Sequence, residues 1–298
     1  MDPLELTKLR SLMKLTDGGE RIKIGLIDGP IDLNHPLFKD TKIRTVSRSQ
    51  AVSCRESSSL ACMHGTFIAG ILVATRASLA PAICPNCELI LRPIFNESNN
   101  EANKGDILPV SNPQELAEAI IQIVDAGAKV INLSLGLYSS SIVKASQLYD
   151  AYDYALRKHV IIVAAAGNQG TIGMLPITDH PWGVPIAACD EIGNLSLISN
   201  IGPSIGKRGL LAPGVNITSV LAGGNYTQLS GTSIAAPFVT GGIALLWSLF
   251  PNATAVEMIT SILQICGIPY AIAHHRSIIP RLFDAEFARS YLEGRYGY

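Results

Sequence analysis

Residues 160–168 have the sequence VIIVAAAGN, in which seven apolar residues are followed by a glycine and an asparagine. A strand that is covered on both faces has such a continuous apolar run, whereas a strand with one face in water alternates apolar and polar residues. The segment before it, Leu148–Lys158, has the composition of a helix. A helix followed by a covered strand predicts a parallel sheet with helices on either side.

Four further apolar runs repeat this pattern along the chain. They are IKIGLID at 22–28, ELILRPIF at 88–95, KVINLSL at 129–135 and GVPIAAC at 183–189. Between the second and third of these, the segment 111–127 predicts a helix that starts at Ser111 or Asn112, has Pro113 in its first turn and stops at Gly127. Right-handed crossovers of this kind join parallel strands into one sheet. We therefore predict an α/β protein with three layers, in which a mostly parallel central sheet lies between helices.

The size of the chain predicts one large domain. Its 298 residues, of which 48% are hydrophobic, are enough to bury a large core, so we expect a single domain over 1–298. Residues from about 271 to 298 are expected to form a C-terminal tail with one short helix near Asp284–Leu292. The polar segment Asn96–Val110 predicts a surface loop.

Charge and hydropathy argue against two classes of partner. With 23 basic and 24 acidic residues the formal net charge is −1, so no overall field attracts nucleic acid or an anionic membrane. The most apolar long stretch, Ile234–Phe250, contains Pro237 and two glycines and is shorter than a typical membrane span. We expect it to be a buried helix, and we expect neither a nucleic-acid partner nor a membrane segment.

Six cysteines leave three interpretations open. They lie at positions 54, 62, 84, 87, 189 and 266. Cys84 and Cys87 form a CxxC pair, and Cys54 and Cys62 flank a serine-rich loop. Disulfides and a zinc site with four thiolates are both compatible with these positions, and a reducing cytosol would leave the thiols free.

Three short motifs contain residues that can form a nucleophilic site. LIDGPID (26–32) places Asp28 at the end of a strand, MHGTFIAGIL (63–72) places His64 just before a helical pattern, and LSGTSIAAPFVTGG (229–242) contains Ser233. The carboxyl ends of parallel strands line a common crevice, so these three side chains are expected to converge. A serine hydroxyl becomes nucleophilic when a neutral imidazole accepts its proton and a carboxylate orients that imidazole.

Each of these residues also has a plainer interpretation. On this interpretation Asp28 only caps a turn, His64 is only a residue at the start of a helix, and Ser233 is only the N-cap of a helix. Asn168 adds a fourth group, because its amide and the backbone N–H of Ser233 at a helix start would form an oxyanion site. The alternative for Asn168 is an asparagine in a turn before Gly170.

Taken in order, the motifs resemble the successive signatures of the subtilisin-like serine proteases. The matching segments are Asp28–Asp32, His64–Thr66, Asn132–Gly136, Ala164–Asn168 and Gly231–Pro237. The order Asp, His, Ser also differs from that of the α/β-hydrolases, in which the serine comes first. The resemblance implies the subtilisin-like fold and a serine endopeptidase that works through an acyl-enzyme. It implies a triad of Asp28, His64 and Ser233, with Asn168 as the oxyanion donor.

The resemblance also implies a peptide as substrate. Ser134, Leu135 and Gly136 would pair with an extended peptide by strand addition, and Ala165, Ala166 and Gly167 would form one wall of the S1 pocket. The dipeptide Leu175-Pro176 falls where the family often has a cis-proline. The oligomeric state does not follow from the sequence.

Departures from the family pattern predict a specialised protease. The segment after His64 has no Asn-rich insertion like the one that holds calcium in secreted subtilisins, so we expect no metal and no cofactor. No export signal and no long propeptide are recognisable, which predicts a cytoplasmic protein. LIDGPID, LRPIF (91–95) and LLAPG (210–214) resemble the proteases that mature cyanobactins by cutting a leader from a ribosomally made precursor peptide. A general degradative subtilisin and a catalytically silent peptide-binding module remain alternatives.

Overall fold

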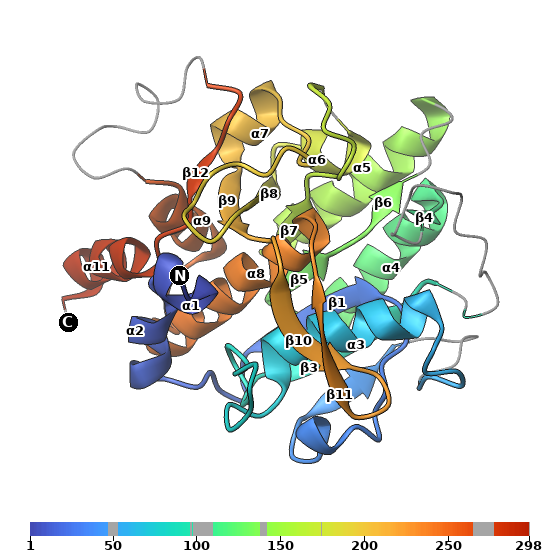
Figure 1. Ribbon diagram of the computed structural model, residues 1–298. Helices are drawn as coiled ribbons and strands as arrows, with labels where there is room; N and C mark the ends of the chain where they lie inside the picture. The colour runs from blue at the N-terminus through green and yellow to red at the C-terminus, as the bar shows by residue number, and fades with distance from the viewer. Residues whose placement is uncertain are drawn as a thin grey trace.

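The structure is a computed structural model that describes residues 1–46, 53–95, 97, 110–137, 142–173, 175–264 and 277–297. These residues contain an eight-stranded sheet with the order β12-β9-β8-β7-β5-β1-β3-β2, and each pair of neighbouring strands is parallel. Its strands are β1 (Lys23–Asp28), β2 (Ile43–Thr45), β3 (Glu88–Pro93), β5 (Val130–Leu133), β7 (Ile161–Ala165), β8 (Gly183–Cys189), β9 (Leu210–Pro213) and β12 (Arg281–Leu282). The predicted α/β class and the mostly parallel sheet are confirmed (Figure 1).

The five apolar runs correspond to β1, β3, β5, β7 and β8, each within two residues of its predicted ends. The sequence did not predict β9, β2 and β12. β2 and β12 are three and two residues long, which is too short to show an apolar run. β9 has four residues, as β5 does, but the apolar run around it is only LLAP, whereas the run around β5 is seven residues long.

Two layers of helices cover the sheet. On one side α3 (Leu60–Val73) and α8 (Thr232–Leu249) pack against each other, and α8 also packs on β5, β7, β8 and β9. On the other side α4 (Pro113–Asp125) and α5 (Ile142–Arg157) pack together, with α4 against β1 and β3 and α5 against β7. The predicted three-layer arrangement is thereby confirmed (Figure 1).

The ends of the helices follow local signals in part. Asn112 caps α4 by accepting the N–H of Glu115, and Gly127, with φ of 89°, follows the helix as its predicted stop. However, α5 starts at Ile142, six residues before the predicted start at Leu148. The helix predicted in the tail is α11 (Ala285–Tyr296), which is capped by Asp284 and continues four residues beyond Leu292.

Helix α8 is the core helix of the protein. Among the described residues it is the one helix long and apolar enough to cross a membrane by length and composition, but 89% of it is buried within the protein. Its small residues allow this close packing: a Cβ on Gly242 would lie 2.6 Å from the ring of Phe283. The burial of α8 agrees with the buried helix predicted for this stretch.

Smaller elements complete the described chain. The antiparallel hairpin of β10 (Ile217–Leu221) and β11 (Asn225–Leu229) leads into α8. Short β4 (Val110–Ser111) pairs in parallel with β6 (Gly136–Leu137). The remaining helices are α1 (Pro3–Leu6), α2 (Leu9–Leu15), η1 (Pro36–Phe38), α6 (Pro176–Asp179), α7 (Pro203–Arg208) and α9 (Ala255–Leu263). Apart from Glu97 and Val110, the predicted loop 96–110 lies outside the described residues, as does Cys266.

Candidate active site

Asp28 and His64 are joined by a hydrogen bond. Asp28 is the last residue of β1, is fully buried, and places Oδ1 2.7 Å from His64 Nδ1. Oδ1 also accepts the N–H of Gly29 at 2.7 Å. The carboxylate therefore orients the imidazole so that Nδ1 faces it. His64 Nε2 is buried and has no hydrogen-bond partner among the described residues.

The position of His64 in its helix differs from the prediction. Helix α3 starts at Leu60, with Ser59 as its cap accepting the N–H of Cys62, so His64 lies inside the helix rather than at its start. The motif 63–72 does not contain Ser59, so it gave no sign that the helix starts at Leu60. The plainer interpretation of His64 as a residue at a helix start is wrong.

Two glycines allow α3 to approach the end of β1 closely. A Cβ on Gly65 would lie 2.6 Å from the carbonyl oxygens of Gly29 and Pro30. A Cβ on Gly29 would lie 2.0 Å from the carbonyl oxygen of Ala61. Since real Cβ atoms do not approach so closely, a side chain at either position would push α3 away from Asp28.

Ser233 lies in the first turn of α8. The N-cap of this helix is Gly231, with φ of 152°, so Ser233 is not the cap. Its side chain is nearly buried, and among the described residues its Oγ has no hydrogen-bond partner. In particular, His64 Nε2 does not bond to it. The structure thus joins Asp28 to His64, and brings the helix of Ser233 against the helix of His64 without a bond between the two side chains. Catalytic hydrogen bonds often form only with substrate bound.

Asn168 bonds to the start of α8 rather than within its own turn. Its Oδ1 accepts the N–H of Thr232 at 2.8 Å and the hydroxyl of Thr232 at 2.9 Å. A Cβ on Gly231 would lie 3.1 Å from Asn168 Nδ2 and 3.4 Å from Ser233 Oγ. The amide N–H₂ group and the serine hydroxyl therefore flank the same point. The interpretation of Asn168 as only a turn residue does not account for these contacts.

Asn200, which sequence reasoning missed, holds the loop that contains Asn168. Its Oδ1 accepts the N–H groups of Gln169 and Thr171, both at 3.1 Å. Its Nδ2 donates to Ala166 O at 3.1 Å and to Gln169 Oε1 at 2.7 Å. Asn200 is 2% exposed. The sequence around it gives no local signal, because its partners lie about thirty positions earlier.

The predicted substrate segments have buried side chains. Ser134, Leu135, Ala165 and Ala166 are each at most 2% exposed. Gly136 lies in β6, where its backbone pairs with β4. The side chains of these four residues are therefore not available to a substrate. The backbone N–H groups of Ala166 and Gly167 are also in use, because they donate to Ile186 O and to Thr232 Oγ1.

The cis-proline that the family often has at Leu175-Pro176 is absent from the described residues. The described residues contain no cis peptide bond, so the bond between Leu175 and Pro176 is trans. Pro176 occupies the first position of α6, where a proline fits because its missing N–H has no partner to bond there.

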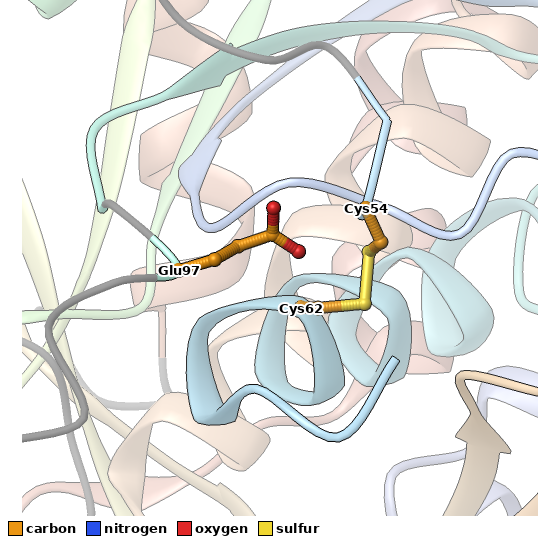
Figure 2. A group of neighbouring side chains, drawn as sticks. All are labelled: Cys54, Cys62 and Glu97. Atoms are coloured by element: carbon orange, nitrogen blue, oxygen red, sulfur yellow. A yellow bond between two sulfur atoms is a disulfide. The ribbon is translucent and has the colours of Figure 1, made fainter. Parts of the chain in front are cut away.

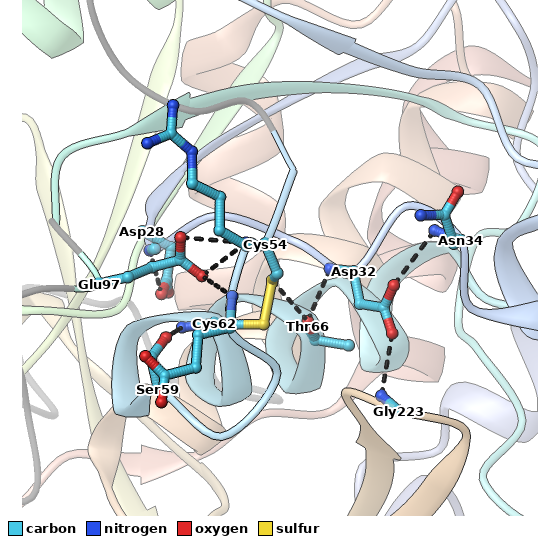
Figure 3. Close-up of a disulfide and its surroundings, with 12 residues drawn as sticks. Asp28, Asp32, Asn34, Cys54, Ser59, Cys62, Thr66, Glu97 and Gly223 are labelled. Atoms are coloured by element: carbon cyan, nitrogen blue, oxygen red, sulfur yellow. Dashed lines mark hydrogen bonds between the residues drawn. A yellow bond between two sulfur atoms is a disulfide. The ribbon is translucent and has the colours of Figure 1, made fainter.

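Of the alternatives for the cysteines, the structure has a disulfide between Cys54 and Cys62 (Figure 3). Cys62 lies in α3 two residues before His64, and Cys54 N–H donates to Ile31 O at 3.2 Å. The disulfide thus links α3 to the stretch between β2 and α3, whose Cys54 bonds to the segment that follows β1. Asp32, in the segment after β1, bonds directly to α3, because its N–H donates to Thr66 Oγ1 at 3.0 Å. Its carboxylate accepts the N–H of Gly223, in the turn between β10 and β11, at 2.9 Å.

Glu97 completes a group of three possible metal ligands with the two disulfide sulfurs (Figure 2). Its carboxylate oxygen Oε1 accepts the backbone N–H groups of Arg55 at 2.9 Å and of Glu56 at 3.0 Å. Because both sulfurs are bonded to each other, they are not thiolates, and the carboxylate is satisfied by backbone donors.

Cys84 and Cys87 are free, buried thiols at the other end of α3. Cys84 Sγ donates to Leu72 O at 3.2 Å, and Leu72 lies ten residues after Cys62 on the helix, or about 15 Å along its axis. Burial raises the pKa of the Cys84 thiol well above its usual value, and a hydrogen bond with Cys84 lowers the pKa of Cys87. A four-thiolate zinc site is therefore wrong, because the two pairs are too far apart.

Comparison with known proteins gives consistent matches. The profile of the subtilase family matches residues 19–265. A thermophilic serine proteinase of Bacillus sp. (strain AK1) is 32% identical over 236 residues, which are 78% of this chain and 54% of that protein. Subtilisin DY of Bacillus licheniformis is 29% identical over 245 residues, which are 80% of this chain and 81% of that protein. The chain thus spans about half the length of the first of these relatives.

Solved structures with the same fold include two maturation proteases. The protease domain of PatA has a TM-score of 0.80 and 28% identity, with 93% of this chain and 97% of that chain covered. The prenylagaramide maturation protease PagA has a TM-score of 0.79 and 27% identity, with 95% and 98% covered. A PatG macrocyclase in complex with peptide has a TM-score of 0.79 at 22% identity, which shows a shared fold.

Proposed function

Because the chain belongs to the subtilase family of serine proteases, we propose that Asp28, His64 and Ser233 hydrolyse peptide bonds through an acyl-enzyme. The observation that supports these roles best is the 2.7 Å hydrogen bond between His64 Nδ1 and Asp28 Oδ1. It leaves Nε2 as the free nitrogen of the imidazole, buried and without a partner among the described residues. A general base needs this arrangement.

In this mechanism each group has one task. Ser233 Oγ attacks the carbonyl carbon of the scissile bond while its proton passes to His64 Nε2, and the buried Asp28 carboxylate stabilises the resulting imidazolium. His64 then gives the proton to the leaving amine. Water enters, loses a proton to His64 and attacks the acyl-enzyme, which releases the second product and restores Ser233.

The charge on the tetrahedral oxygen is stabilised by two donors. One is Asn168 Nδ2, since Asn168 Oδ1 is held by Thr232 and the N–H₂ group is turned toward Gly231 and Ser233. The other is the backbone N–H of Ser233, which lies in the first turn of α8 where helical N–H groups are not used within the helix.

Substrate recognition uses backbone groups of Ser134–Gly136 for main-chain pairing, because the side chains of Ser134 and Leu135 are buried. Ala165–Gly167 form one wall of the S1 pocket, and the N–H groups of Ala166 and Gly167 already donate to Ile186 O and Thr232 Oγ1. Main-chain pairing does not depend on the substrate's side chains. Selectivity therefore has to come from other contacts.

We further propose that the substrate is a ribosomally made precursor peptide that is cut at defined bonds. This rests on the motifs LIDGPID, LRPIF and LLAPG and on the similarity to PatA and PagA, whose names describe maturation proteases. The similarity to subtilisins is the observation that favours the alternative of a degradative enzyme. The cytoplasmic location stays a prediction.

The proposed nucleophile is tested with a fluorophosphonate probe, which reacts quickly only with an activated serine. We expect rapid labelling of the wild type, and no labelling of Ser233→Ala, whose melting temperature should stay near that of the wild type. Peptidase activity should fall about a million-fold, a magnitude known for subtilisin, a member of the same family. If the wild type is not labelled, the protein is the silent peptide-binding module; activity of the purified variant within tenfold of wild type would refute the role of Ser233.

The proposed substrate class is tested by mass spectrometry of two digests, one of casein and one of a precursor peptide with its leader. We expect slow cleavage of casein and much faster cleavage of the precursor at one or two bonds. Rapid, indiscriminate fragmentation of casein would establish the degradative alternative.

A further inference from the structure

Helix α8 contains a proline one turn after Ser233. In an α-helix the carbonyl of each residue accepts the N–H of the residue four positions later. Four positions after Ser233 is Pro237, which has no N–H. The carbonyl of Ser233 therefore lacks its ordinary helical donor, and an unpaired buried carbonyl destabilises the fold.

The hydroxyl of Ser134 takes the place of that donor. Ser134 Oγ donates to the carbonyl oxygen of Ser233 at 2.8 Å, although the two residues lie 99 positions apart. Ser134 is fully buried just after β5. The start of α8 is therefore held by a side chain from the end of a neighbouring strand.

Two further hydrogen bonds fix the direction of this contact. Asn132 Nδ2 donates to Ser134 Oγ at 2.7 Å, so the hydroxyl proton of Ser134 is directed to Ser233. Thr240 Oγ1 donates to Asn132 Oδ1 at 2.9 Å. Asn132 and Thr240 are also fully buried. This chain of bonds begins and ends on α8, with β5 between, and each bond in it strengthens the next.

We propose that Ser134 is a positioning residue, whose side chain holds the backbone of Ser233 in place of the helical hydrogen bond that Pro237 removes. This inference rests on the proposed role of Ser233 as nucleophile. Because Ser233 Oγ must meet both the substrate and His64 Nε2, a shift of about 1 Å in its backbone can cost about a hundredfold in rate. The expected pairing of Ser134 with substrate uses its backbone, so a side-chain variant separates the two roles.

A double-mutant cycle tests the replacement directly. Ser134→Ala is made in the wild-type background and in Pro237→Ala, which restores an N–H four positions after Ser233. In the wild-type background we expect kcat to fall about tenfold or more, with KM within about twofold. In the Pro237→Ala background the same change should lower kcat less than about threefold, because the helix now supplies the donor. Equal losses in the two backgrounds would overturn the proposal.

The melting temperatures of the same four proteins give a second test, which does not require catalysis. We expect Ser134→Ala to lower the melting temperature by several degrees with Pro237 and by clearly less with Ala at 237. A wild type that the fluorophosphonate does not label would refute the proposed function. The melting temperatures of the four proteins would still decide whether Ser134 replaces the missing donor. An equal loss in both backgrounds would show that it does not.

Ser261→Ala is the matched control. Ser261 is also fully buried, and its Oγ donates to a backbone carbonyl, that of Met258, at 2.8 Å within α9. We expect this variant to leave kcat unchanged and to have the same effect in both backgrounds. If Ser134→Ala lowered kcat no more than Ser261→Ala does, Ser134 would be a structural residue without a positioning role.

Discussion

Gly65, next to His64 in α3, has no room for a side chain. Its Cβ would lie 2.6 Å from two backbone oxygens, which cannot move aside as a flexible side chain could. We expect Gly65→Ala to displace α3 from Asp28, to lower kcat at least tenfold and to destabilise the fold by about 1–3 kcal/mol, which is typical of overpacking. Steady-state kinetics and thermal unfolding measure both effects.

Gly294 provides the control for this substitution. It also lies in a helix, α11, but a Cβ there would meet nothing within 4 Å. Gly294→Ala should keep full activity and stabilise the protein by up to about 1 kcal/mol through helix propensity. Equal activity of the two variants would show that the close approach at Gly65 does not hold His64 in place.

The side chains that support the proposed catalytic groups were harder to find from the sequence. Thr232 and Asn200 fix the amide of Asn168 and its loop, and Ser134 reaches the carbonyl of Ser233. Thr232 and Ser134 lie inside motifs that the sequence singled out, but their partners were not evident from it. Asn200 lies outside every motif.

The Cys54–Cys62 disulfide joins the start of α3 to the stretch that leads into it, and the N–H of Cys54 bonds to Ile31 O after β1. Closing a loop of this length stabilises a protein by about 2–3 kcal/mol in the chain-entropy model. We expect the double variant Cys54→Ser/Cys62→Ser to melt about 4–12 °C below the wild type, given about 2–4 °C per kcal/mol for a protein of roughly this size. Differential scanning calorimetry measures the difference.

A reducing agent supplies the control for the disulfide. Dithiothreitol should lower the melting temperature of the wild type toward that of the double variant and leave the variant unchanged. Cys84 and Cys87 are free thiols, so dithiothreitol does not change them. A wild type that melts at the same temperature with and without dithiothreitol would show that Cys54 and Cys62 are not paired in the protein.

Helix α8 shows how one element serves both the core and the site. Its first turn contains Ser233, and its later turns are buried against β5, β7, β8 and β9. Packing on four strands fixes the helix axis, while the bonds from Asn168 and Ser134 fix its first turn. The proposed nucleophile, Ser233, therefore takes its position from the core of the protein.

At the scale of the whole molecule, stability should not depend on a bound metal ion. In the described part of the chain, the one group of three His, Cys, Asp or Glu side chains near enough to share an ion includes the disulfide sulfurs. We expect EDTA to shift the melting temperature by no more than about 2 °C, whereas loss of an ion held at a hundred times its dissociation constant would remove about 2.7 kcal/mol. Unfolding with EDTA, and again after excess calcium is added, checks this.

A large drop with EDTA that calcium reverses would reveal a structural calcium site and contradict this prediction. A drop that zinc reverses instead would contradict it in the same way.

The sequence by itself determined the class of fold and the candidate residues. Continuous apolar runs marked β1, β3, β5, β7 and β8, because a strand covered on both faces must be apolar at every position. Asp28, His64, Asn168 and Ser233 were found because each lies at the end of such a run or beside small residues. These signals are local, so a short window of sequence contains them completely.

Only the tertiary structure decided how these residues are held. It paired Cys54 with Cys62, made the bond before Pro176 trans, and placed His64 inside α3. It also joined residues that lie 99 positions apart, Ser134 and Ser233, and 64 positions apart, Asn168 and Thr232. A buried polar group needs a hydrogen-bond partner, but its own sequence does not specify which distant residue will supply it. That choice is made when the packing of the sheet and helices brings the two segments together.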